Sequence, residues 1–214
     1  MDPIVISLDG NIGAGKTTLL NELRIAMPDV EVVLEPVGEW LALKDADGRS
    51  LLELFYEDKR RWAYTFQNCA LLTRLRTLKA ALASTKKRVV ITERSLLTDR
   101  YVFAEMLREA GDINDIEWQL YLQWYDTFAS GLPMAGVIYL TTDVTLSAAR
   151  IAGRAREGET IPLDYLEALE AQHQKWLATT DLPVVRVSTA SMDNAVADIA
   201  DFVTALLDNH RKSM

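Results

Sequence analysis

Short apolar runs alternate with long amphipathic stretches along the whole chain. Five of these runs are rich in β-branched residues and almost continuously apolar, which is typical of strands that helices cover on both faces. We expect a parallel sheet, because strands separated by long helical segments pair in that way. The predicted strands are residues 4–8, 30–34, 88–92, 136–140 and 183–187.

The segments between these runs carry apolar residues at helical spacing. Asp143 and Asp193 are candidate N-caps, since a side-chain oxygen at that position can accept a free backbone N–H. The stretch 50–84 fits either one long helix or two. The pattern predicts an α/β fold, a five-stranded parallel sheet flanked by helices in a single domain over residues 1–214, with ligands at the carboxyl ends of the strands. The predicted helices are residues 16–27, 50–84, 98–110, 114–129, 143–153, 163–179 and 192–209.

A glycine-rich segment directly follows the first predicted strand. It consists of Gly10, Asn11, Ile12, Gly13, Ala14, Gly15, Lys16, Thr17 and Thr18. In a phosphate-binding loop of this pattern, glycines let backbone N–H groups surround phosphate oxygens, Lys16 reaches the terminal phosphates, and the Thr17 hydroxyl can join a magnesium shell. The alternative is a plain glycine-rich turn, but helical spacing of the apolar residues after Thr17 favours the loop. The segment predicts binding of ATP or GTP.

Composition narrows the partners and the setting. The chain has 214 residues, 49% of them hydrophobic, which is enough for one sizeable core. Its net charge of −8 disfavours a duplex nucleic-acid or anionic-membrane surface and favours a small-molecule substrate. The single cysteine, Cys69, allows no internal disulfide and suits a reducing compartment. With no leader-like segment and no apolar run of about 18 residues, we expect a soluble cytoplasmic protein without nucleic-acid or membrane partners.

Charged residues follow two of the predicted strands. Glu35 comes after the second strand, and Glu93, Arg94 and Ser95 come after the third. Glu35 is the natural candidate to accept a hydroxyl proton, while Glu93 could hold magnesium directly or through water. Arg94 could stabilise charge on a transferred phosphoryl group or orient a neighbouring carboxylate. A carboxylate at a strand end can also be only a loop cap, and that alternative stays open.

Several further segments occur in a characteristic order. They are Glu35-Pro36-Val37-Gly38-Glu39-Trp40, the pair Phe66-Gln67, Glu93-Arg94-Ser95 with Asp99-Arg100-Tyr101-Val102-Phe103, and Ile161-Pro162-Leu163-Asp164-Tyr165-Leu166 after an arginine-rich stretch. Together these segments resemble the deoxynucleoside kinases related to deoxycytidine kinase and deoxyguanosine kinase. The resemblance covers residues 4 to about 177. It implies a P-loop kinase fold with an arginine-rich lid, and transfer of the ATP γ-phosphoryl group to the 5′-hydroxyl of a deoxynucleoside.

The resemblance also implies catalytic roles. Glu35 would be the general base with Arg94 as its partner near the 5′-oxygen. Lys16 and the loop amides would hold the phosphates, and Thr17 with Glu93 would form the magnesium shell. Simple electrostatics favours a neutral acceptor, because Glu35 would repel a monophosphate, which would itself need cationic residues to bind it.

A pocket for the base is expected on the stretch 50–84. Gln67 suits a bidentate contact with a base edge, because its amide offers a donor and an acceptor in one plane. Phe66, Phe103 and Trp40 offer rings to stack on the base, and by resemblance Tyr56 holds the sugar 3′-hydroxyl. Two alternatives stay open, namely that the aromatic residues are only core and that Gln67 lies on a solvated face.

Arg74 and Asp99 bear on the choice of base. They match a charged pair that lies beside the base in the deoxycytidine and deoxyguanosine kinases. A paired arginine and aspartate would leave little room for a 5-methyl group. We therefore expect deoxyadenosine, deoxyguanosine or deoxycytidine to be preferred over thymidine, with a surface ion pair as the alternative.

The lid is expected at about residues 150–160. Arg150, Arg154 and Arg156 could neutralise charge on a triphosphate, and by resemblance Glu159 contacts the sugar 3′-hydroxyl. Gly158 departs from the common family pattern, which leaves the lid geometry less defined than the loop. A solvated charged loop is the alternative.

The apolar helical segment 117–128 carries Trp118, Trp124 and Tyr125 and could pack on a second copy of the chain, giving a homodimer. A core helix is an equal alternative. Two other functions compete with the deoxynucleoside kinase. They are a nucleoside monophosphate kinase and a non-enzymatic nucleotide-dependent switch.

Overall fold

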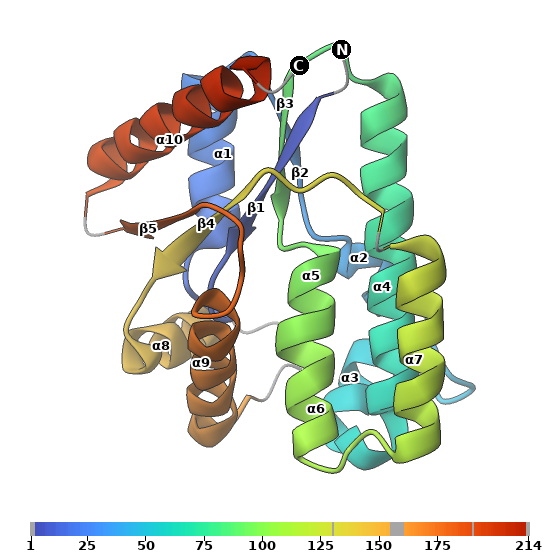
Figure 1. Cartoon of the computed structure of the whole chain (residues 1–214). Helices are drawn as coiled ribbons and strands as arrows, with labels where there is room; N and C mark the ends of the chain where they lie inside the picture. The colour runs from blue at the N-terminus through green and yellow to red at the C-terminus, as the bar shows by residue number, and fades with distance from the viewer. Residues whose placement is uncertain (1–2, 130, 155–160, 190, 213–214) are drawn as a thin grey trace.

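A computed structural model of the chain describes residues 3–129, 131–154, 161–189 and 191–212. Its centre is a five-stranded, all-parallel sheet in the order β2-β3-β1-β4-β5 (Figure 1). All five predicted strands are confirmed, with ends shifted by no more than one residue. The strands are β1 (Ile4–Asp9), β2 (Val30–Val33), β3 (Val89–Glu93), β4 (Gly136–Thr141) and β5 (Val184–Ser188).

Helices connect and cover the strands. They are α1 (Lys16–Ala26), α2 (Val37–Ala42), α3 (Leu51–Glu57), α4 (Lys59–Ser84), α5 (Leu96–Thr98), the π-helix η1 (Asp99–Ala104), α6 (Glu105–Glu109), α7 (Asp115–Phe128), α8 (Val144–Arg154), α9 (Leu163–Leu177) and α10 (Met192–Lys212). The stretch 50–84 is two helices, because Asp58 ends α3 and its carboxylate accepts the Arg61 N–H at 3.0 Å to cap α4. The expected helix 98–110 is present as a continuous helical stretch from Leu96 to Glu109, of which η1 is a π-helical part. Helix α2 was not predicted.

The two proposed N-caps have different outcomes. The Asp143 carboxylate accepts the backbone N–H of Thr145 at 2.8 Å, as a cap of α8 should. The Asp193 prediction is wrong, because α10 already begins at Met192 and the Ser191 hydroxyl accepts an N–H of its first turn, from Asn194 at 3.4 Å.

Helices bury both faces of the sheet. Successive side chains along each strand point to opposite faces, so each strand packs against helices on both sides. On β1, Ile4, Ile6 and Leu8 pack with α1 and α10 in one core cluster. Val5 faces the opposite side and packs with Leu78 of α4. The sheet thus forms the middle of three layers, as the nearly continuous apolar runs predicted.

Beyond the carboxyl ends of the strands, the helices form two groups (Figure 1). One group contains α8 and α9, and the other contains α3, α4, α6 and α7, with α4 and α7 packed side by side. The phosphate-binding segment that follows β1 packs against α8 and α9, with Gly13 close to Ser147 and Asn11 bonded to Leu166. None of the helices in the described part of the chain combines the length and the apolar composition that a membrane span requires.

Candidate active site

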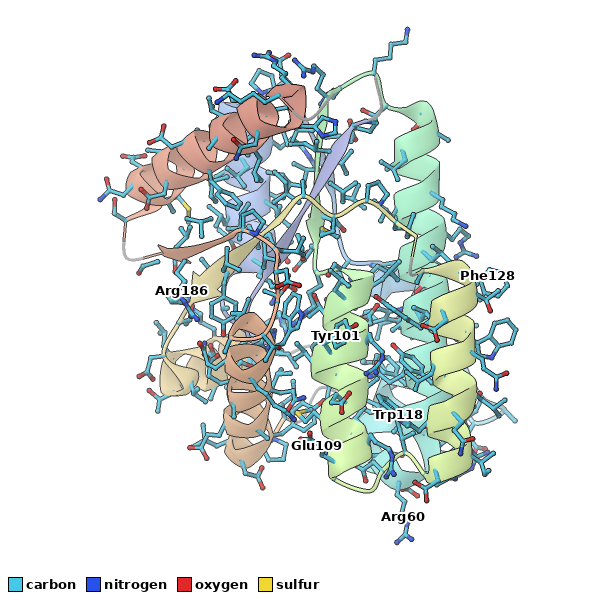
Figure 2. The ribbon with its side chains drawn as sticks, viewed as in Figure 1. Arg60, Tyr101, Glu109, Trp118, Phe128 and Arg186 are labelled. Carbon is cyan, nitrogen blue, oxygen red and sulfur yellow. The ribbon has the colours of Figure 1, made fainter. Side chains whose placement is uncertain are left out.

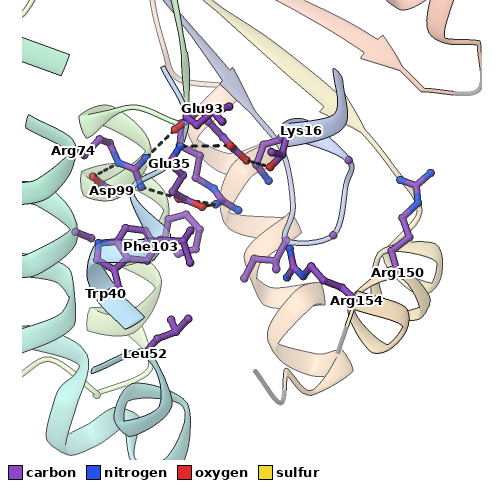
Figure 3. Close-up of a pocket in the computed structure, with 18 of the residues that line it drawn as sticks. Lys16, Glu35, Trp40, Leu52, Arg74, Glu93, Asp99, Phe103, Arg150 and Arg154 are labelled. Atoms are coloured by element: carbon purple, nitrogen blue, oxygen red, sulfur yellow. Dashed lines mark hydrogen bonds and ion pairs between the residues drawn. The ribbon is translucent and has the colours of Figure 1, made fainter. Parts of the chain in front are cut away.

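A cavity of about 670 Å³ opens at the carboxyl ends of the strands (Figure 3). Residues from distant parts of the sequence line it, and most of them fall into three sets. The loop end consists of Ile12, Gly13, Gly15, Lys16, Thr17, Thr18, Arg150 and Arg154. The aromatic end consists of Trp40, Phe55, Tyr56, Phe66, Gln67 and Phe103. Between them lie Glu93 and four residues called here the ion network, Glu35, Arg74, Arg94 and Asp99.

Glycine is required in the loop for steric reasons. Gly10 and Gly13 have φ angles of 147° and 79°, which L side chains rarely adopt. A Cβ on Gly13 would lie 2.5 Å from the carbonyl oxygen of Ser147, and one on Gly10 would lie 2.8 Å from that of Leu140. The loop therefore passes too close to α8 and β4 for any larger residue.

Lys16 is buried at the start of α1. Its Nζ donates to the carbonyl oxygens of Gly10 at 3.0 Å and Asn11 at 2.7 Å. Burial, assisted by the nearby Arg94 charge, lowers the pKa of Lys16 to about 7. An anion bound at the loop would favour the charged form.

Asn11 is not among the residues that line the cavity, and its side chain bonds to α9. Its side chain is buried and donates to the Leu166 carbonyl oxygen of α9 at 2.9 Å, while its Oδ1 accepts the Ile12 N–H at 2.8 Å. The Asn11 side chain thus ties the loop to the helix that follows residues 155–160.

Two oxygen groups meet beside the loop. The Thr17 hydroxyl donates to Glu93 Oε1 at 2.9 Å, joining the start of α1 to the end of β3. Glu93 Oε2 also accepts the Glu35 N–H at 3.5 Å. A hydroxyl and a carboxylate oxygen are the ligand types that magnesium takes in phosphoryl-transfer sites.

The ion network holds Glu35 from two sides. Arg94 Nη1 donates to both carboxylate oxygens of Glu35 at 2.8 Å, and Arg74 Nη2 donates to Oε1 at 2.9 Å (Figure 3). Burial alone would raise the pKa of the Glu35 carboxyl, but the Arg94 and Arg74 guanidiniums lower it to about 2. The Glu35 carboxylate is therefore ionised throughout the neutral range.

Arg74 connects three elements. Its Nε donates to Asp99 Oδ2 at 2.8 Å and its Nη1 to the Glu93 carbonyl oxygen at 2.8 Å. The side chains of Arg74 and Asp99 are only 4% and 2% exposed, so the alternative of a surface ion pair is wrong. The contact of Arg74 with Glu35 was not predicted.

Arg94 has an unusual backbone. Its φ of 59° makes it the only non-glycine residue with positive φ in the described part of the chain, at a cost of about 1–2 kcal/mol. Its N–H donates to the Leu8 carbonyl oxygen at 3.0 Å, and its guanidinium carbon lies 4.9 Å from the centre of the Phe103 ring. The turn aims the side chain from the sheet edge into the cavity.

The aromatic end is both core and cavity wall. The ring centres of Phe55 and Phe66 are stacked 4.5 Å apart, and Trp40 meets Phe66 edge-on at 5.2 Å. The indole of Trp40 donates to the Thr73 hydroxyl at 3.0 Å, which fixes its orientation. These rings are therefore held rigidly where they line the cavity.

Gln67 also lies in this wall. It is 1% exposed, so the alternative of a solvated face is wrong. Its buried Oε1 has no hydrogen-bond partner among the described residues. An unpaired buried acceptor of this kind is stabilised by a ligand that donates to it.

Two arginines of α8 complete the loop end (Figure 3). Arg150 Nη1 donates to the Ala14 carbonyl oxygen at 2.9 Å, and Arg154 lines the cavity at the end of the helix. The predicted lid residues Arg156 and Glu159 lie outside the described residues.

Sequence reasoning missed some lining residues, among them Phe55 and Tyr165. The Tyr165 ring is covered by Lys59 Nζ at 5.2 Å from its centre, a contact between α9 and the start of α4. Tyr165 belongs to a segment that carried the family resemblance, and Phe55 directly precedes Tyr56. Both signals were present in the sequence, although neither residue was assigned a role.

Comparison with known proteins gives a consistent result. A family model described as deoxynucleoside kinase matches residues 6–210. Deoxycytidine kinase of Mus musculus is 39% identical over 194 residues, covering 80% of this chain and 74% of that protein, and the Homo sapiens enzyme of the same name is 38% identical with the same coverage. Mitochondrial deoxyguanosine kinase of Xenopus laevis is 33% identical over 191 residues, covering 80% of this chain and 72% of its own length. The chain therefore belongs to the deoxynucleoside kinase family of ATP-dependent phosphotransferases.

Proposed function

We propose that ATP binds at the loop end and a deoxynucleoside at the aromatic end, with Glu35 directed at the 5′-hydroxyl between them. The observation that carries this assignment is the position of Glu35. Its ionised carboxylate is buried in the same cavity as the phosphate-binding loop, and two guanidiniums hold it there. Phosphoryl transfer requires the attacking hydroxyl oxygen to lie in line with the donor phosphate, and a carboxylate beside that hydroxyl can orient it.

Glu35 acts as the general base and orients the hydroxyl. A carboxylate with a pKa of about 2 is a weak base, so it removes the proton only as the oxygen–phosphorus bond forms. The transition state of phosphoryl transfer is loose and makes little demand on early proton removal. Arg94 holds Glu35 and stabilises charge beside the 5′-oxygen.

The loop end supplies the positive charge for the donor. Lys16 and the loop amides bind the β- and γ-phosphates, and Arg150 and Arg154 neutralise charge on the triphosphate. The same role is proposed for Arg156, from the sequence alone. Thr17 and Glu93 would hold magnesium, since their oxygens already lie 2.9 Å apart. When bound, the ion would neutralise charge on the donor phosphates.

The acceptor is a neutral nucleoside. In the ion network both guanidiniums are already paired with carboxylates, so the network offers no excess positive charge for an acceptor phosphate. Gln67 binds the base edge, Trp40, Phe66 and Phe103 surround its faces, and Tyr56 with Glu159 holds the sugar 3′-hydroxyl.

Label transfer from γ-labelled ATP tests this assignment. We expect labelled 5′-monophosphate from deoxynucleosides and no transfer to deoxynucleoside monophosphates. Transfer to monophosphates alone would establish a nucleoside monophosphate kinase, and slow hydrolysis without any labelled acceptor would establish a nucleotide-dependent switch.

The base preference follows from the buried pair of Arg74 and Asp99. Because both lie in the cavity wall, they leave little room for a 5-methyl group and offer hydrogen bonds to amino or carbonyl substituents. We expect kcat/KM for deoxyadenosine, deoxyguanosine or deoxycytidine to exceed that for thymidine. Thymidine as the best of the four substrates would overturn this preference.

A second copy of the chain is the proposed partner. The inner face of α7 is core, with Tyr121 and Tyr125 buried, while its outer face carries an apolar stripe. The stripe consists of Ile116, Leu120, Trp124 and Phe128, spaced by four residues and 41–66% exposed. Figure 2 shows Phe128 on this outer face. Light scattering tests the homodimer, and a 24.0 kDa species at all concentrations would exclude it.

A further inference from the structure

We propose that Asp9 is a positioning residue for phosphoryl transfer. Through the Thr98 and Ser95 hydroxyls, its carboxyl group fixes the turn that aims Arg94 at Glu35. The inference rests on the proposed function of Arg94 and Glu35, and it adds a residue that is not among those lining the cavity.

Asp9 occupies a protected place at the end of β1. It is 0% exposed and lies on the same face of the strand as Val5 and Ser7. Its two carboxyl oxygens bond to different elements, Oδ2 to the Ser7 hydroxyl of its own strand and Oδ1 to the Thr98 hydroxyl of α5. Burying a carboxyl group costs free energy unless hydrogen bonds satisfy it. An apolar side chain at this position would avoid that cost, so stabilising the fold does not by itself explain an aspartate here.

The bonds continue from Thr98 to the residue after Arg94. Thr98 Oγ1 accepts the Ser95 N–H at 3.1 Å and lies 2.9 Å from Ser95 Oγ, while the Thr98 N–H donates to Ser95 Oγ at 3.1 Å. Each hydroxyl has a single proton. If Thr98 donates to Asp9, Ser95 must donate to Thr98, so the carboxylate gives both hydroxyls one orientation.

This chain of bonds matters because Arg94 adopts a strained backbone conformation. A non-glycine residue in the left-handed region stays there only where its surroundings fix it. The Arg94 N–H is held by the Leu8 carbonyl oxygen, and the following residue, Ser95, is held through Thr98 by Asp9. Both flanks of the strained residue are thus tied to the end of β1.

A shift of this turn would reach Glu35 directly. Arg94 Nη1 contacts both oxygens of the Glu35 carboxylate at 2.8 Å, so displacing the guanidinium displaces the group that faces the 5′-hydroxyl. Misplacement by about 1 Å at a reacting group can reduce the rate of the chemical step by roughly 10²-fold. The expected signature is a loss of kcat with little change in KM for ATP.

Three substitutions separate this role from general support of the fold. Thr98→Val removes the bond to Asp9 together with the contacts of the Thr98 hydroxyl to Ser95, at nearly constant volume, and Thr98→Ser keeps all of them. Ser7→Ala removes the other bond to the Asp9 carboxyl group without touching the Arg94 turn. We expect Thr98→Val to lower kcat about tenfold or more with KM for ATP within about twofold of wild type. Thr98→Ser and Ser7→Ala should retain kcat within about threefold.

A double-mutant cycle with Arg94→Lys shows whether the effect passes through Arg94. In the Arg94→Lys background, Thr98→Val should lower kcat by less than about twofold, because the group it positions is already gone. If Thr98→Val does not fold, as judged by circular dichroism, Asp9→Asn is measured by the same criteria.

Wild-type kcat in the Thr98→Val variant would overturn the inference. So would a loss confined to KM for ATP, which would place the effect on the phosphate-binding loop, or an equal loss of kcat in Ser7→Ala. A wild-type protein that phosphorylates no deoxynucleoside would instead reject the proposed function itself.

Discussion

Two regions of the cavity, the ion network and the loop end, differ in how their charged side chains are paired. In the ion network the guanidiniums of Arg74 and Arg94 are paired with the carboxylates of Glu35 and Asp99. At the loop end, Lys16 and Arg150 donate hydrogen bonds to backbone carbonyl oxygens, which carry no net charge. Within the described part of the chain, the ion network is therefore electrically balanced before any ligand binds, whereas Lys16 and Arg150 of the loop end contact uncharged groups and can bind an anion.

This difference indicates how the site divides its work. A balanced, buried network is costly to form but stays fixed, which suits a neutral acceptor that must be oriented. A hydrogen bond from a cationic side chain to a phosphate is stronger than its bond to a neutral carbonyl oxygen, so exchanging one for the other favours binding of the donor. The loop end should therefore control donor binding, and the ion network should control the geometry of the reaction.

The largest expected effect is at the loop end. Lys16→Ala removes the cation nearest the donor phosphates, and we expect kcat/KM for ATP to fall by at least about 10³-fold. Steady-state kinetics checks this. Lys175→Ala is the matched control, because Lys175 is an exposed lysine of α9 paired with Glu109. Retained activity in Lys16→Ala would contradict the assignment of the loop.

The next effect compares two arginines of α4. Arg74→Met leaves Asp99 and part of the Glu35 charge buried without a partner, and should destabilise the fold by about 3–5 kcal/mol. Arg76→Met removes an exposed pair with Glu39, with side chains 63% and 39% exposed, and should cost no more than about 1 kcal/mol. Urea unfolding measures both. Equal losses would mean that the ion network is not the balanced unit described above.

The smallest effect concerns pH. Because burial lowers the pKa of Lys16 to about 7, this group is charged below that pH and becomes neutral as pH rises through it. Only the charged form binds phosphate well, so the Kd for ATP should be about fivefold weaker at pH 8 than at pH 7. Isothermal titration calorimetry checks this, with Lys16→Arg as a control that stays charged. Equal pH dependence in the two proteins would reject the assignment to Lys16.

The sheet and the loop could be predicted because their signals are local. Continuous β-branched runs marked all five strands, and the glycine spacing marked the loop. The break at Asp58 was left open, since no proline or glycine marks it, although the Asp58 carboxylate that caps α4 is a residue type that often begins a helix. Helix α2 was missed because six residues are too few to show a period.

The ion network could be predicted only in part. The pairing of Arg74 with Asp99 was expected from the resemblance, but the bond from Arg74 to Glu35 joins residues 39 apart and depends on how α4 packs against β2 and β3. The positive φ of Arg94 has no sequence signal at all, because tertiary contacts impose it on a residue that disfavours it. Local sequence patterns thus predicted the reacting groups, whereas the hydrogen bonds between them depend on tertiary packing and could not be predicted from those patterns.

The most direct test of the account compares two glutamates near β2. Glu35→Gln keeps the shape of the side chain but removes the charge between Arg74 and Arg94, whereas Glu31→Gln makes the same change within the strand, in a surface pair with Lys87. Single-turnover label transfer from ATP to a deoxynucleoside should be slower by roughly 10²–10⁴ in Glu35→Gln. The Glu31→Gln rate should equal that of wild type. Near-normal transfer by a folded Glu35→Gln protein would contradict the claim that this carboxylate acts on the 5′-hydroxyl.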